Sequence, residues 1–141
     1  MTEIVHTFVQ VSPDCPVKTG TIPPTKQDAN PSIHVLQYQL LTQYPYRFTL
    51  EDLIYEVHIR HKQIPAEEIA THADAIREAL FQKKHPCMRA SMLTKKYGWG
   101  VHHDQEGKLA LYGMETDEYR RFVESGEDGL KLVFGMRNSR A

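Results

Sequence analysis

The residues best equipped for chemistry lie between Lys83 and Tyr112. The first half of this stretch contains five lysines and arginines and no acidic side chain, with the hydroxyl groups of a serine and a threonine among them. Guanidinium, ammonium and hydroxyl groups are donors that bind the oxygens of a phosphate or a carboxylate. We therefore predict an anion-binding site, and its candidate residues are Arg89, Ser91, Thr94, Lys95 and Lys96. The alternative is a solvated connector, in which these charges keep the surface soluble or pair with acidic residues elsewhere in the fold.

Two aromatic residues follow directly, in the sequence Tyr97-Gly98-Trp99-Gly100. Glycine has no side chain, so a planar ligand or another backbone can approach these rings closely. A base or another flat group held by the basic side chains would then stack on Tyr97 or Trp99. The alternative is that Trp99 anchors the hydrophobic core, because an indole buries a large apolar area.

Three further residues are candidates for catalysis, namely Cys87, His102 and His103. Cys87 lies close in sequence to several basic residues, and positive charge favours the reactive thiolate. Adjacent residues of a strand point to opposite faces, so only one of the two histidines can face a given site. His102 would share its face with Asp104 and act there as an acid or base. The alternative is that Cys87 is a small buried apolar residue and that both histidines are structural.

The sequence predicts no metal centre and no cofactor. His58 and His61 are three residues apart on an expected helix and offer two metal ligands, but no third ligand lies near them in sequence. Nucleic acid is also a disfavoured partner. The third expected helix would be the recognition helix of a winged helix-turn-helix, yet it begins with Glu67 and Glu68, which phosphates would repel.

The composition is that of an ordinary globular protein, with 40% hydrophobic and 25% charged residues and a net charge of -1. A chain of 141 residues is the usual length of one domain, so we expect a single domain over residues 1–141. We expect no membrane association, because no apolar run approaches the ~20 residues that span a bilayer, and no secretory signal at the amino end. These features indicate a cytoplasmic protein in which Cys15 and Cys87 are free thiols.

The remaining patterns predict the elements that position these residues. A strand is expected over residues 4–11, a proline-rich loop over 12–31, and three amphipathic helices over 33–44, 49–63 and 65–81. Residues 98–113 read as a β-hairpin that turns at Gly107, followed by a short helix from Thr116, a last strand over 130–134 and a frayed tail over 137–141. This order predicts an α+β fold, in which an antiparallel sheet of about four strands packs on one side against three to four helices.

Four motifs resemble those of a family of small, uncharacterised bacterial and fungal proteins. They are DCP (14–16), LQYQLL (36–41), PCMRAS (86–91) and LTKKYGWGVHHDQEGKLALYG (93–113). The resemblance covers nearly the whole chain and implies a domain of unknown function, with no substrate or catalytic residue to transfer.

The sequence therefore favours a binding module for a small phosphate- or nucleotide-like anion. A thiol-dependent enzyme that uses Cys87, and a structural protein whose basic surface meets an acidic partner, are the alternatives.

Overall fold

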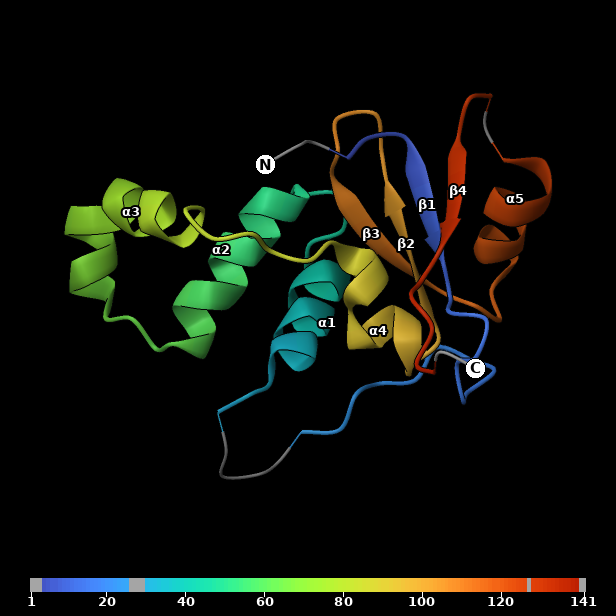
Figure 1. Cartoon of the computed structure of the whole chain (residues 1–141), viewed down its shortest axis with the longest axis horizontal. Helices are drawn as coiled ribbons and strands as arrows, with labels where there is room; N and C mark the ends of the chain where they lie inside the picture. Colours follow the sequence, from blue (N-terminus) through green and yellow to red (C-terminus); the bar gives the residue numbers. More distant parts are fainter. Residues whose placement is uncertain (1–3, 26–29, 127, 140–141) are drawn as a thin grey trace.

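A four-stranded sheet with the strand order β3-β2-β1-β4 forms the centre of the fold (Figure 1). The computed structural model describes residues 4–25, 30–126 and 128–139, apart from the side chain of Ser125. The strands are β1 (Thr7–Gln10), β2 (Trp99–His103), β3 (Leu109–Gly113) and β4 (Lys131–Phe134). The helices are α1 (Ile33–Gln43), α2 (Leu50–His61), α3 (Ala66–Leu80), α4 (Met92–Lys95) and α5 (Asp117–Ser125), with a 3-10 turn η1 (Met88–Ala90) before α4.

The α+β class is confirmed, but the sheet is mixed and not purely antiparallel. β1 pairs antiparallel with β2, and β2 with β3, whereas β4 pairs parallel with β1. The reason is the helix between β3 and β4. A helical crossover lets the chain return across the sheet and run in the same direction, which a tight hairpin cannot do.

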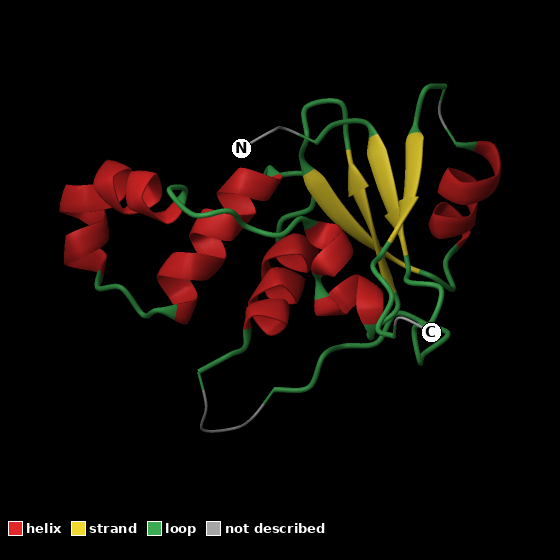
Figure 2. Cartoon of the chain, in the orientation of Figure 1, coloured by secondary structure: helices red, strands yellow, loops and turns green. Residues whose placement is uncertain are grey.

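Helices cover both faces of the sheet and not one face alone. α1 and α4 lie on one side and α5 on the other, as Figure 2 shows. The main core is on the side of α1 and includes Val9, Val101 and Leu109 from the sheet together with Leu40 of α1. On the other side, the ring of Phe122 stacks on Phe8 at 4.6 Å between ring centroids. Successive residues of β1 and β2 point to opposite faces of the sheet, so these strands contribute side chains to an apolar layer on each face.

Local signals in the sequence set several of these elements. Thr49 and Asp52 form a reciprocal capping box at the start of α2, in which each side chain accepts from the other residue's backbone N–H. The β2–β3 hairpin forms as expected, with antiparallel pairing from Trp99 opposite Gly113 to His103 opposite Leu109. Gly107 has a φ of +80° in its turn, a conformation that favours glycine.

The loop between α1 and α2 covers the outer edge of β3. The backbone N–H of Tyr46 donates to the carbonyl of Leu109 at 2.8 Å, and the N–H of Leu109 donates to the carbonyl of Phe48 at 2.9 Å. These bonds satisfy backbone groups that an edge strand would otherwise expose. They also carry the chain from the helical face round the edge of the sheet, which places Tyr46 beside β2 and β3.

The helix α3 lies beyond α2, far from the sheet (Figure 1). None of its residues is buried. Arg77 holds it to α2 through Asp52 at 3.0 Å and Glu51 at 3.5 Å, and the guanidinium lies over the ring of Tyr55. Among the described residues, no helix is long and apolar enough to cross a membrane.

The C-terminal segment is bonded to the motif around Asp14, although the sequence suggests a frayed tail over 137–141. The carboxylate of Asp14 accepts hydrogen bonds from the backbone N–H groups of Asn138 and Ser139. The bond from Asn138, followed by that from the hydroxyl of Ser12, holds the pKa of Asp14 well below its usual value. Residues 140–141 lie outside the described part of the chain, as do residues 26–29 of the proline-rich loop.

Candidate functional site

The predicted cluster of basic and aromatic side chains does not converge on one hollow. Arg89 donates from Nε to the carbonyl of Phe134 at 2.7 Å, at the end of β4. Trp99 donates from Nε1 to the carbonyl of Thr21 at 2.8 Å, and its ring packs beside Tyr38. Two members of the predicted site are therefore used to fix different loops. The interpretation of Trp99 as a packing residue fits these contacts better than a stacking platform.

Most of the other predicted ligand-binding residues are engaged in contacts within the fold. Thr94 is fully buried, and its hydroxyl donates to the carbonyls of Met88 and Ser91. Ser91 is buried too and caps α4 by accepting from the N–H of Leu93. The ring of Tyr97 stacks on His34. Lys96 is exposed, while Lys95 is half-buried and its carbonyl accepts from Asn138.

Among the described residues, neither predicted catalytic histidine pairs with Cys87. Cys87 is half-buried and packs against the main core, and Cys15 is a buried free thiol. His102 lies on the opposite face of the sheet, where it contacts Phe122 of α5. His103 is on the core side, but neither of its ring nitrogens has a hydrogen-bond partner among the described residues. Within the described part of the chain, neither predicted histidine is therefore bonded to the Cys87 thiol.

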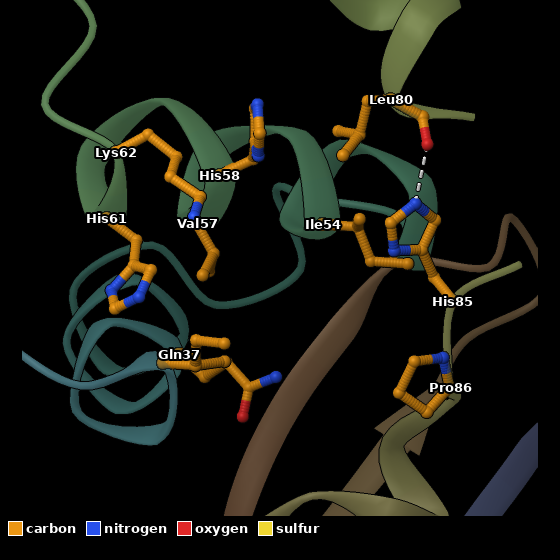
Figure 3. Close-up of a pocket in the computed structure, with 10 residues that line it drawn as sticks. Gln37, Ile54, Val57, His58, His61, Lys62, Leu80, His85 and Pro86 are labelled. Atoms are coloured by element: carbon orange, nitrogen blue, oxygen red, sulfur yellow. Dashed lines mark hydrogen bonds between the residues drawn. The ribbon is translucent and has the colours of Figure 1, made fainter. Parts of the chain in front are cut away.

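A groove between α1, α2 and the segment that follows α3 is a candidate site (Figure 3). It has a volume of about 290 Å³ and a mainly apolar lining. This volume is close to the lower end of small-molecule pockets, roughly 300 Å³. The described residues that line it are Ile33, Gln37, Ile54, Val57, His58, His61, Lys62, Leu80, His85 and Pro86.

Four basic side chains surround this apolar groove, and no aspartate or glutamate is among the described residues that line it. His58 and His61 face it from one turn of α2, Lys62 follows at the end of that helix, and His85 approaches from the opposite side (Figure 3). Burial lowers the pKa of His58, and the positive charges of Lys62, His85 and His61 lower it further. This arrangement disfavours another cation and favours an anion.

Hydrogen bonds hold several of these side chains in place. His85 donates from Nε2 to the carbonyl of Leu80 at 2.7 Å, and His61 donates from Nδ1 to the carbonyl of Pro31 at 3.2 Å. The carbonyl oxygen of Gln37 accepts from the hydroxyl of Ser91 at 2.7 Å. Each imidazole bonded in this way keeps its second nitrogen for a proton or a ligand. Ser91 thus contributes to the groove indirectly, by orienting Gln37.

Comparison with known proteins gives a family but no activity. A family model described as "Family of unknown function (DUF6157)" matches residues 1–141. The chain belongs to this family. The resemblance seen in the sequence is thereby confirmed at the level of an uncharacterised family. No curated protein and no solved structure matches this DUF6157 member.

Metal binding has no support in the described part of this DUF6157 chain, where no group of three or more His, Cys, Asp or Glu side chains is arranged to hold an ion. The pair formed by His58 and His61 instead belongs to the wall of the apolar groove. In the sequence, this pair is recognisable only as possible metal ligands. Gln37, Lys62 and His85 are not recognisable there as members of one site, because the groove is assembled from three separate segments.

Proposed function

We propose that this protein is a cytoplasmic binding module for a small anionic ligand with an apolar body, and that the groove between α1 and α2 is its site. The observation that carries the proposal is the combination of apolar walls with four basic side chains and no acidic residue in the described lining. A small anion is also the ligand that the basic segment suggests in the sequence, although the sequence favours a phosphate- or nucleotide-like one. The position differs, because Arg89 and Trp99 are occupied elsewhere.

The chemistry of the groove favours a carboxylate on a hydrocarbon or aryl group over a phosphate or a nucleotide. Ile54 and Val57 offer apolar contact, and burial of such surface is favourable in proportion to its area. Lys62 supplies a charge, and Gln37 supplies amide hydrogens from another part of the lining. An amphipathic anion uses both parts of the site, whereas inorganic phosphate uses only the polar part.

Calorimetric titration of the full chain with hexanoate, benzoate, their neutral amides and inorganic phosphate tests the proposal. We expect the two carboxylates to bind and the amides to bind more weakly, because only the anions carry a charge opposite to that of Lys62. Lys62 is exposed, so Lys62→Gln should weaken carboxylate binding by about two- to fivefold, the range for an exposed ion pair. Lys96→Gln is the matched control, since it removes the same charge from an exposed residue of the originally predicted site.

Two results would contradict the proposal. One is the absence of carboxylate binding at millimolar concentration, measured on a protein that is folded by circular dichroism. The other is a loss of binding in Lys96→Gln that equals the loss in Lys62→Gln, because this would indicate that the ligand binds near Lys96 and not in the groove.

A further inference from the structure

A second constellation lies on the face of the sheet opposite the main core and shares no residue with the groove. The hydroxyl of Tyr46 is 2.8 Å from Nδ1 of His102 and 2.7 Å from the hydroxyl of Tyr112. His102 is buried, and its ring packs on Phe122 at 4.4 Å between centroids. Tyr46 therefore bonds to both an imidazole and a second phenol.

The fold holds Tyr46 in an unusual conformation to make these contacts. Its φ is +59°, in the left-handed region that residues with a large side chain seldom adopt. The backbone bond from Tyr46 to Leu109 fixes this conformation where the α1–α2 loop rounds the edge of β3. Such conformations persist only where the surroundings impose them, and they cluster at functional sites.

A shallow hollow of about 380 Å³ opens beside this phenol. Tyr46 and His102 line it together with Asp104, Gln105, Glu106 and Lys108. The ammonium of Lys108 pairs with Glu106 at 3.0 Å. One carboxylate oxygen of Asp104 accepts hydrogen bonds from two backbone N–H groups of the turn. Because Lys108 and Glu106 neutralise each other, the negative charge of Asp104 is the net charge of the described residues that line the hollow. That negative charge disfavours an anionic ligand, in contrast to the groove.

We propose that Tyr46 is the nucleophile of a second site, which accepts an acyl group from a small uncharged ester. The phenol oxygen of Tyr46 attacks the ester carbonyl, and its proton passes to Nδ1 of His102. The C–O bond of the ester then breaks, and His102 gives this proton to the leaving oxygen, which departs as an alcohol. The hydroxyl of Tyr112 turns its hydrogen toward the Tyr46 oxygen as negative charge develops there. Water then attacks the tyrosyl ester and loses a proton to Nδ1 of His102. The bond between the acyl carbon and the Tyr46 oxygen breaks, a carboxylic acid is released, and His102 passes the proton to the Tyr46 oxygen.

The roles of the three residues follow from their positions. Tyr46 is the one that forms a bond to the substrate, and it contacts both other members of the chain. His102 accepts the proton, and Tyr112 is a positioning residue that acts through Tyr46. A positioned base accelerates such a step by about 100-fold or more.

The test is acylation of the full chain by p-nitrophenyl acetate at neutral pH, with the modified tyrosines identified and timed by peptide mass mapping. Tyr44 is the matched control within the same protein, because it is an exposed phenol two residues away. We expect Tyr46 to be acylated about 100-fold faster than Tyr44. Tyr46→Phe should remove the corresponding release of p-nitrophenolate, whereas Tyr44→Phe should leave it unchanged.

Two further arms separate proton transfer from a structural effect. His102→Gln should remove the excess rate of Tyr46, and Tyr112→Phe should reduce it. In the unmodified chain, the ratio of the Tyr46 rate to the Tyr44 rate should fall toward one as the pH is lowered, because a protonated imidazole accepts no proton. This arm decides the question even where a variant fails to fold. Equal rates for Tyr46 and Tyr44 at neutral pH, or an excess that survives in folded His102→Gln, would overturn the proposal.

Discussion

His103 should make the stability of this protein strongly dependent on pH between neutrality and pH 4. Its side chain is fully buried in the main core, and neither ring nitrogen has a hydrogen-bond partner in the described part of the structure. Burial lowers the pKa of His103 from 6.5 to about 4, with a further contribution from His102. The unfolded chain, in which His103 is solvated, keeps the ordinary value and binds a proton first.

The size of the effect follows from this difference in pKa. At about 1.36 kcal/mol for each pKa unit, the shift corresponds to about 3 kcal/mol of unfolding free energy. Above the unfolded pKa neither state is protonated, so the free energy of unfolding is unaffected. As the pH falls through 6.5 toward about 4, the unfolded state takes up more protons and stability is lost, by about 2.5 kcal/mol at about pH 4.5.

The substitution His103→Leu isolates the contribution of His103 to the pH dependence of the unfolding free energy, because leucine has a similar size and no titrating group. Urea unfolding of the variant and the parent chain over about pH 7.5 to 4.5 gives both the midpoint and its dependence on denaturant. We expect the variant to be at least as stable near neutrality, since it removes two unbonded nitrogens from the core. At the acid end it should be more stable than the parent by about 2.5 kcal/mol or more.

His72→Gln is the control, because His72 is exposed on α3 and its replacement should leave the pH dependence unchanged. The reasoning is refuted if His103→Leu loses stability with falling pH as steeply as the parent chain does. An NMR titration that places the pKa of His103 at its ordinary value would refute it independently.

Three other expectations concern separate parts of the molecule. Gly100→Ala should lower the free energy of unfolding by about 2 kcal/mol, measured in urea, because the added Cβ would lie 2.6 Å from the ring of Tyr119; an unchanged midpoint would contradict this. Asp14→Ala should speed amide hydrogen exchange at Asn138, since its carboxylate is the acceptor of that N–H; equal exchange in both chains would show that other contacts hold the tail. Carboxylate binding in the groove should strengthen as the pH falls. The pKa of His58 is lowered, so its imidazole is neutral in the empty groove, and a bound carboxylate favours the protonated imidazole. Calorimetry should find this trend absent in His58→Gln.

Local patterns in the sequence were sufficient to predict the positions of most helices and strands of this fold. The capping box of Thr49 and Asp52, the periodicity of α1 to α3 and the turn at Gly107 each depend on residues that are close in the chain. The predicted strand and helix positions are accordingly near those observed. The hairpin also placed His102 and His103 on opposite faces, because successive side chains of any strand alternate.

The direction of β4 and the positions of the candidate sites were decided only by tertiary structure. The local sequence pattern of β4 is compatible with either a parallel or an antiparallel strand. The crossover through α5 determines that β4 runs parallel to β1. The groove joins α1, α2 and residues 80–86, and the phenol of Tyr46 reaches His102 from 56 positions away. The amino-acid order established which side chains were available for chemistry. Packing determined which of them meet, because contacts between distant segments depend on how whole helices and strands fit together and not on any local pattern.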